Sequence, residues 1–138
     1  MIVVDISALV AIVFGEPERE VFVRAIQQAD RALISTVSVV EARMVVHGRR
    51  GQRGVVLLDD ILRLPAFELV APSRAEADAA YAAFVAFGRG SGHPASLNFG
   101  DVFSYALAKV RALPLLYKGA DFAQTDVLSA LADDDSAR

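Results

Sequence analysis

The sequence of 138 residues contains no cysteine and only two histidines. Disulfide bonds and thiolate metal sites are therefore excluded, and a reducing cytoplasm is the expected location. No apolar run approaches the roughly 20 residues that a membrane helix needs, so we expect no membrane association. The first residues, MIVVD, also lack the basic stretch that opens a secretory signal. Without sulfur and with little imidazole, any metal site would be built from oxygen ligands, which favour Mg²⁺ or Mn²⁺ over Zn²⁺.

Three signatures of phosphate and nucleotide chemistry are missing as well. The stretch "DISALVAI" lacks the G-x-G-x-x-G of a dinucleotide-binding domain. Ser7 stands where a phosphatase of the Asp-x-Asp type would carry its second aspartate, and "FELVAPS" offers no phospho-accepting aspartate for a receiver domain. The sequence therefore argues against these three classes.

Positive charge is also in short supply, since the net charge is −3 and the pI is about 5.3. Bulk charge does not indicate nucleic-acid binding, which would need a local basic patch. The chain is instead rich in apolar residues, which make up 54% of it, and this is too apolar for a disordered chain. We expect one domain over residues 1–138 with one core, and an acidic, solvated and disordered tail from about residue 131.

Short apolar runs typical of strands alternate with helical patterns along the chain. The expected strands cover 2–4, 32–35, 67–70 and 114–117. The expected helices cover 7–13, with Ser7 as a candidate N-cap, and 18–29, 36–51, 55–64, 73–87 and 99–112, with a short one after Thr125. The glycine-rich loop 88–94 is expected to be the most mobile part. This alternation predicts an α/β fold with a mainly parallel central sheet.

Two aspartates follow expected strands. Asp5 comes directly after the first strand, and Asp121 closely follows the fourth. Because parallel α/β sheets bind ligands beyond the carboxyl ends of their strands, both are expected at the same functional edge. The alternative for each is an ordinary turn residue.

Glu41 lies within an apolar stripe formed by Val37, Val40 and Met44 at helical spacing. If that stripe is buried, the Glu41 carboxylate must be paired, hydrogen-bonded, bound to a metal or protonated. A buried ion pair with an arginine is the alternative to a functional role.

Asp101 opens the apolar helix in "LNFGDVFSYALAK". It can serve as the third helical residue of a capping box with Asn98. It can also serve as a metal ligand, because the helix dipole keeps a carboxylate in the first turn ionised. If the four acids meet, their repulsion raises some pKa values, and a divalent cation relieves it. Such a cluster is suited to phosphodiester hydrolysis.

Four blocks of the sequence carry a family resemblance: "MIVVDISALVAIVFGEPE", "STVSVVEA", "LNFGDVFSYALAK" and "PLLYKGADFAQTD". In this order, and spanning nearly the whole chain, they resemble the PIN-domain ribonucleases of the VapC toxin type. The resemblance implies a three-layer α/β/α PIN fold and a Mg²⁺- or Mn²⁺-dependent endoribonuclease. It also implies that the chain is the toxin of a type II toxin–antitoxin pair, with a VapB-like antitoxin and a homodimeric state.

The resemblance also assigns roles to particular residues. The four family acids match Asp5, Glu41, Asp101 and Asp121. Asp5 and Asp101 are implied as direct metal ligands, and the other two complete the pocket directly or through water. Ser7 matches a hydroxyl residue that supports the site, and Asn98 is implied to orient Asp101.

Two positions depart from the family pattern. Ile6 replaces the usual threonine, and Ala120 replaces a polar or acidic residue. The first change removes a hydroxyl beside a metal ligand, and the second removes an acid of a second metal site. Both leave open a catalytically silent PIN module that acts only as a binding or regulatory partner.

Basic residues near these motifs are candidates for RNA contacts, because RNA approaching an acidic pocket needs cations at its rim. The alternative is that they are solvated cations near helix ends. The candidates are Arg43, Arg49, Arg50, Lys109 and Lys118.

Overall fold

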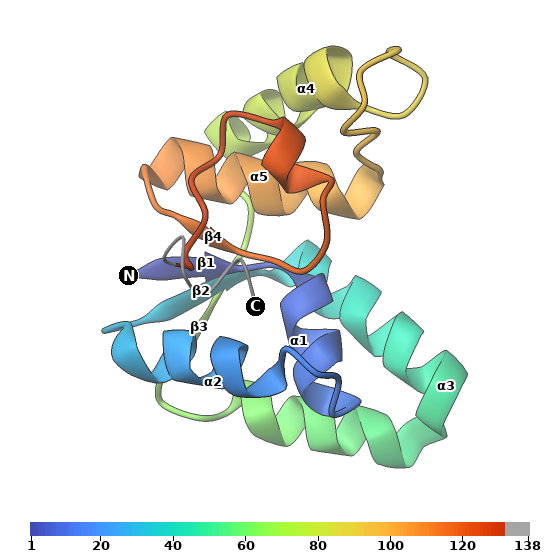
Figure 1. Ribbon diagram of the computed structural model, residues 1–138, viewed down its shortest axis with the longest axis vertical. Helices are drawn as coiled ribbons and strands as arrows, with labels where there is room; N and C mark the ends of the chain where they lie inside the picture. The colour runs from blue at the N-terminus through green and yellow to red at the C-terminus, as the bar shows by residue number, and fades with distance from the viewer. Residues whose placement is uncertain (132–138) are drawn as a thin grey trace.

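The computed structural model describes residues 1–131 and shows a four-stranded parallel sheet (Figure 1). The strands are β1 (Ile2–Val4), β2 (Ala32–Ser35), β3 (Phe67–Val70) and β4 (Leu115–Leu116). Their order across the sheet is β3-β2-β1-β4, and every pairing is parallel. The expected α/β fold is confirmed. The predicted acidic tail lies, from residue 132 onward, outside the described residues.

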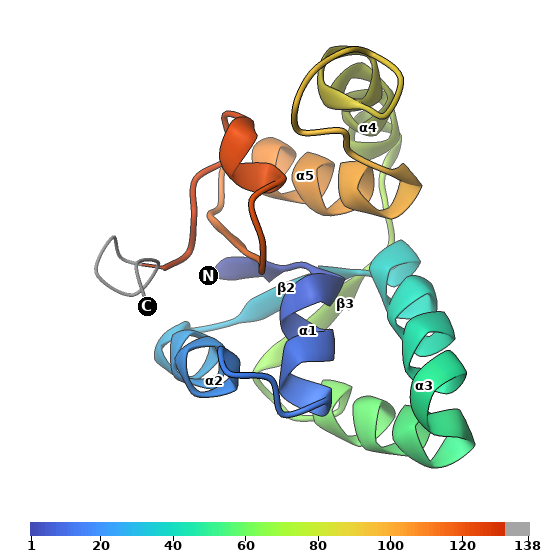
Figure 2. The same cartoon turned by 45° about the vertical axis from the view of Figure 1, so that its right-hand side comes forward.

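Helices cover both faces of the sheet, which gives three layers (Figures 1 and 2). One layer holds α1 (Ile6–Val13), α2 (Arg19–Gln28) and α3 (Thr36–Leu62). The other holds α4 (Arg74–Phe87), α5 (Phe99–Arg111) and the 3₁₀ helix η1 (Phe122–Gln124). No helix among residues 1–131 is long and apolar enough to cross a membrane.

The strands divide the core between these layers. Ile2, Val4 and Ile34 pack with α1, α2 and α3, whereas Val3 and Leu33 pack with α4 and α5. Side chains alternate across a strand, so β1 and β2 supply apolar residues to both faces. A sheet covered on both sides therefore requires continuous apolar strands, as their sequences show.

Two expected helices are corrected by the structure, and two others are confirmed as parts of α3. The first begins at Ile6 rather than after Ser7, because the Asp5 side chain caps it. The helices expected at 36–51 and 55–64 are confirmed as the two parts of α3, which meet at a kink where Gly51 has non-helical backbone angles (φ +65°, ψ −164°) that suit glycine. The helix expected after Thr125 is wrong, since in the described part of the chain the last helix is η1.

The segment after η1 instead forms backbone hydrogen bonds with the edge strand β4. Leu115 donates its backbone N–H to Leu128 at 2.8 Å and accepts from Ala130 at 2.9 Å. These long-range hydrogen bonds replace the local ones that a helix would have made. They return the end of the described chain to β4, the strand that precedes Asp121.

The loop 88–94 keeps its predicted irregular form, with positive φ at Gly90 and Gly92. Its base is closed by a hydrogen bond of 2.9 Å from the Arg89 N–H to the Leu97 carbonyl. The ring of His93 also meets that of Phe87 edge-on at 4.9 Å. The loop therefore starts beside the N-terminus of α5, and its mobility stays a prediction.

Glu76 is a buried carboxylate in the first turn of α4. It forms a capping box with Ser73, and its other oxygen lies 3.3 Å from the Arg111 guanidinium of α5. Burial alone raises the pKa of Glu76, but the hydrogen bonds from Ser73 and the charge of Arg111 outweigh it and hold the pKa below 4.5. The ionised side chain thus joins α4 to α5.

We expect Glu76→Gln to lower the unfolding free energy at neutral pH, because glutamine keeps the cap but loses the charge. A depressed carboxylate pKa stabilises the fold above the unfolded value of about 4.5 and loses this effect as the pH falls through the folded value. The difference between wild type and variant should therefore shrink in acid, as followed by urea unfolding from pH 7 to pH 3. Glu20→Gln, at an exposed first-turn glutamate of α2, is the control. A difference that stays constant with pH would contradict the assignment.

Candidate active site

Asp5 stands at the carboxyl end of β1 and is 2% exposed. One carboxylate oxygen accepts the Ser7 N–H at 3.0 Å, which caps α1. The other accepts the Ser104 hydroxyl at 2.6 Å, and Ser104 in turn lies 3.2 Å from the Ser38 hydroxyl. Both oxygens are therefore held by donors from α1 and α5, which satisfy the hydrogen-bonding needs of a buried carboxylate.

Ser38 and Ser104 are two site residues that the sequence analysis did not identify. Both are almost fully buried, and each lies one helical turn from a predicted acid, Ser38 before Glu41 and Ser104 after Asp101. Residues three apart on a helix share a face. A hydroxyl at that spacing from an acid was the signal available in the sequence.

Asp101 makes the capping box predicted with Asn98. Its backbone N–H donates to the Asn98 side chain at 2.9 Å, and its carboxylate accepts the Asn98 N–H at 3.0 Å. Burial raises the pKa of Asp101 to about 6. The Asn98 N–H opposes this, whereas the charges of Asp5 and Asp121 add to it. Asp101 thus caps α5 and also faces two other acids.

Glu41 also faces the acidic site, but for a different reason from the one predicted. The stripe thought to be buried is in fact open to solvent, since Val40 is 54% and Met44 is 70% exposed. Glu41 is half-buried because α5 approaches α3 so closely that a side chain at position 100 would overlap its carboxylate. A side chain at position 100 would displace the Glu41 carboxylate, and Gly100, which precedes Asp101 directly, leaves it in place.

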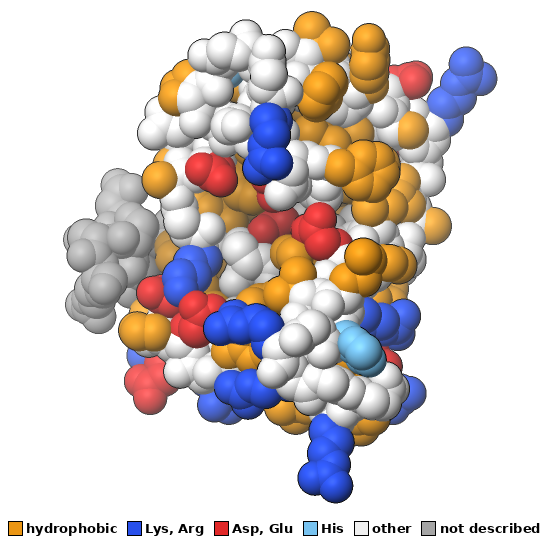
Figure 3. Space-filling model, turned by 90° about the vertical axis from the view of Figure 1, so that its right-hand side faces the viewer, with side chains coloured by type: hydrophobic (Ala, Val, Ile, Leu, Met, Phe, Trp, Pro, Cys, Tyr) orange, Lys and Arg blue, Asp and Glu red, His pale blue; other side chains and the backbone are white. Residues whose placement is uncertain are grey.

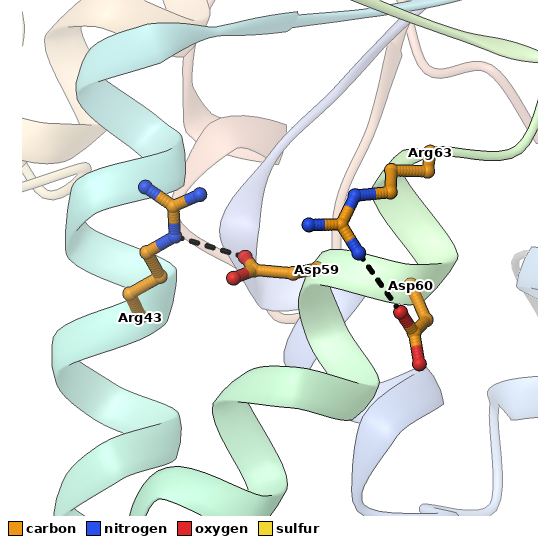
Figure 4. A network of polar contacts seen from close by, with 4 residues as sticks. All are labelled: Arg43, Asp59, Asp60 and Arg63. Atoms are coloured by element: carbon orange, nitrogen blue, oxygen red, sulfur yellow. Dashed lines mark hydrogen bonds and ion pairs between the residues drawn. The ribbon is translucent and has the colours of Figure 1, made fainter.

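The alternative of an ion pair between Glu41 and an arginine is not realised, since none joins them within residues 1–131. Its pKa is raised, first by burial and then by the charges of Asp5 and Asp101. The neighbouring Arg43 instead pairs with Asp59 at 2.9 Å, across the bend of α3 (Figure 4). Glu41 therefore carries an uncompensated negative charge toward the other acids.

Asp121 is exposed and lies on the loop between β4 and η1. Its charge contributes to the raised pKa of Asp101. Ser7 helps to hold this loop, because its hydroxyl accepts the Lys118 N–H at 3.0 Å. The effects of these charges on pKa indicate that the predicted acids lie near one another. Asp5 and Asp101 act on Glu41, and Asp5 and Asp121 act on Asp101.

Figure 3 looks onto the edge at which the strands end. Acidic side chains gather near the centre of this face, in a hollow between the helical layers, with basic and apolar side chains around them (Figure 3). Crowded carboxylates of this kind repel one another, and a cation relieves the repulsion.

The donor set fits a hard divalent cation that keeps part of its water. Within residues 1–131 no three acidic or histidine side chains stand close enough to enclose an ion by themselves. Mg²⁺ needs only one or two carboxylates, because water completes its octahedral shell. The all-oxygen donors and the raised pKa values of Glu41 and Asp101 agree with such a site.

Most of the predicted RNA-contacting cations already have partners. Arg43 pairs with Asp59, Lys109 with Asp126 at 3.1 Å, and Lys118 with Glu16 and Glu18. The guanidinium groups of Arg49 and Arg50 lie 4.2 and 5.1 Å from the centre of the Phe14 ring. Their roles as RNA contacts stay predictions.

Arg89 is a further basic residue near the acids that the sequence analysis did not single out. Its charge acts on Asp101 and partly offsets the rise of that pKa. Within residues 1–131 the Arg89 side chain makes no ion pair or hydrogen bond, and its backbone is fixed to Leu97, next to the cap of α5. A spare cation therefore stands at the rim of the acidic site.

A parallel sheet with an acidic, oxygen-only site at its carboxyl edge defines an α/β protein suited to divalent-cation chemistry on phosphate esters. The chain belongs to the PIN domain family, whose family model matches residues 2–128. Within that family it belongs with the VapC ribonucleases, as its relatives show. The family expected from the four sequence blocks is thus confirmed.

Among these relatives, Ribonuclease VapC30 of Mycobacterium tuberculosis is 46% identical over 125 residues, which cover 91% of this chain and 95% of the relative. The fold is similar to the crystal structure of Mycobacterium tuberculosis VapC20, described as a sarcin-ricin loop cleaving toxin, with a TM-score of 0.77 at 17% identity over 93% of this chain and 97% of the other. A toxin–antitoxin complex from Klebsiella pneumoniae gives a TM-score of 0.68 at 19% identity over 95% and 98% of the two chains. At these identities the two structures establish the fold alone.

Proposed function

We propose that this chain is the toxin of a type II toxin–antitoxin pair and that it hydrolyses RNA phosphodiester bonds with Mg²⁺ or Mn²⁺ as cofactor. The observation that carries the proposal is the cluster of four carboxylates at the carboxyl edge of the sheet, two of which have raised pKa values. The similarity to proteins named VapC ribonucleases supports it. One PIN domain would account for the whole activity.

In this proposal Asp5 and Asp101 would hold the cation, and Glu41 and Asp121 would bind its water ligands. When bound, the cation supplies charge neutralisation and a more acidic water. Asp5 is fixed by Ser7 and Ser104, so its oxygens need no reorganisation. The Glu41 carboxylate makes no hydrogen bond within residues 1–131, which leaves it able to accept a proton from the attacking water.

The catalytically silent module is the second candidate, and Ile6 and Ala120 are the observations in its favour. Two other hydroxyls remain at the site: that of Ser7 accepts the Lys118 N–H, and that of Ser104 donates to Asp5. The named relatives favour the ribonuclease. Metal binding without cleavage of any of several structured RNAs would support the silent module instead.

Asp101→Asn tests the proposed function directly. Asparagine can still accept the Asn98 N–H, and the loss of one charge from the crowded site offsets a weaker cap, so the unfolding free energy should change by about 1 kcal/mol or less. Cleavage should nevertheless fall by two orders of magnitude or more, on the order of what loss of a principal charge-stabilising group costs. The measurement is cleavage of structured RNA by purified protein with Mg²⁺, with Mn²⁺ and with EDTA.

The matched control is Asp78→Asn, which removes the same charge from an exposed position on α4. It should cleave like wild type. Equal, metal-independent cleavage by wild type and folded Asp101→Asn would sink the proposal that these carboxylates hold a catalytic cation.

We also propose that Arg89 contacts an RNA phosphate, together with those of the five predicted cations that RNA can draw from their present partners. In an Asp101→Asn background, which prevents cleavage, Arg89→Ala should weaken RNA binding and lower the salt slope by about 1. Arg74→Ala, at an exposed arginine of α4, is the control. An RNA affinity and a salt slope unchanged from those of the Asp101→Asn variant would contradict a phosphate contact by Arg89.

We propose that partner proteins bind the exposed apolar surface of this chain. A groove of about 380 Å³ lies between α4 and α5, and Tyr81, Phe84 and Phe99 expose large apolar side chains at it. Val40 and Met44 expose more on α3. Patches of this kind mark protein contacts, and we propose that they serve a homodimer and a VapB-like antitoxin. Sedimentation of the purified chain as a monomer would contradict the dimer, and failure of a VapB-like antitoxin to bind it would contradict that partner.

The proposed site of action is the cytoplasm, where the RNA substrate and a reducing environment coincide. Fractionation of cells that produce the protein would test this location. Recovery in the membrane or exported fraction would contradict it.

A further inference from the structure

Lys118 lies two residues after the end of β4 and three residues before Asp121. Its ammonium group pairs with Glu16 and lies 3.1 Å from a carboxylate oxygen of Glu18. Both glutamates stand in the connection between α1 and α2. The side chain thus ties the loop that carries Asp121 to a segment far away in the sequence.

The side chains of this ion-pair contact are partly shielded from solvent. The side chains of Lys118, Glu16 and Glu18 are only 35%, 27% and 36% exposed. One oxygen of Glu18 is buried and accepts no hydrogen bond within residues 1–131. The neighbouring ammonium charge is therefore what compensates its burial, and removal of that charge is costly.

The backbone of Lys118 is attached as firmly as its side chain. Its N–H donates to the Ser7 hydroxyl at 3.0 Å, and the Ser7 N–H donates to Asp5 at 3.0 Å. One continuous path of hydrogen bonds therefore runs from a buried acid of the site to the loop. Gly119, with a φ of +97°, then turns the chain toward Asp121.

The chain beyond η1 is attached separately. Asp126 accepts a hydrogen bond from the Tyr105 hydroxyl and pairs with Lys109, both on α5. The exposed Asp121 lies between these two attachments, and Lys118 is the nearer one in sequence. The position of Asp121 relative to the other acids depends on both attachments.

We propose that Lys118 is a positioning residue, which holds Asp121 in the acidic site through its bridge to Glu16 and Glu18. The proposal rests on the proposed function, because it concerns the same cation site. This role differs from an RNA contact. Two carboxylates surround the Lys118 ammonium group, so the three side chains together do not present positive charge to a phosphate. The two roles predict opposite effects when the glutamates are neutralised.

The test uses Lys118→Met and the double variant Glu16→Gln/Glu18→Gln, with Lys118→Arg as the conservative replacement. Arg31→Met is the matched control, because it breaks an ion pair of 3.0 Å with Glu68 outside the acidic site. Three properties are measured on the full chain: Mn²⁺ affinity by calorimetry, kcat and KM for RNA cleavage, and hydrogen exchange over residues 117–124.

We expect Lys118→Met and the double variant to lose about 10- to 100-fold in Mn²⁺ affinity or kcat, as loss of a residue that orients a ligand does. KM for RNA should stay nearly constant, and exchange over 117–124 should rise in both. Lys118→Arg should restore much of the loss, and Arg31→Met should behave like wild type.

Tighter RNA binding by the double variant would overturn the proposal, because it would mean that freeing Lys118 supplies a phosphate contact. Unchanged Mn²⁺ affinity, kcat and exchange in Lys118→Met would overturn it too. Failure of the wild type to bind Mn²⁺ and to cleave would instead refute the proposed function. Hydrogen exchange would still decide whether Lys118 anchors the loop.

Discussion

Mutual repulsion of carboxylates at one edge of the sheet is the constraint on which the rest of the structure depends. Asp5 and Asp121 arrive there from neighbouring parallel strands, and α3 and α5 add Glu41 and Asp101. No arrangement of this kind is stable by itself, since burial and like charge together raise the pKa values of Glu41 and Asp101. The fold supplies the free energy that keeps these groups together, and a cation would return part of it by binding.

The surrounding contacts can be understood as means of tolerating that charge. Asp5 is stabilised by donors on both oxygens, and Asp101 by the cap and dipole of α5. Gly100 lets α5 approach the Glu41 carboxylate. Asp121 stays exposed, between one attachment at Lys118 and another at Asp126 beyond η1. The cations nearest in sequence are paired elsewhere, so the acids are left unneutralised.

Much of this could be predicted from local sequence. Buried β-branched runs indicated the strands. Asp5 and Asp121 were identified by their places after strands, Asp101 by its place at a helix start, and Glu41 by its spacing within an apolar stripe. Prediction failed where contacts between residues far apart in sequence determine burial or secondary structure. The exposed stripe of Val40 and Met44 has the same spacing as a buried stripe. The chain after Thr125 pairs with β4 instead of forming a helix. Ser38, Ser104 and the charge of Arg89 on Asp101 became visible only once the elements were packed. The mobility of the loop 88–94 and the individual roles of the acids remain predictions.

The most direct test of this account is the thermal unfolding midpoint of wild type and Glu41→Gln, each in EDTA and in Mg²⁺ or Mn²⁺. If repulsion dominates the site, Glu41→Gln should raise the midpoint in EDTA by roughly 3 °C or more, the effect of about 1 kcal/mol in a domain of this size. Divalent metal should stabilise wild type and should stabilise the variant less. A variant that is less stable than wild type in EDTA, with no effect of metal on either protein, would contradict the account.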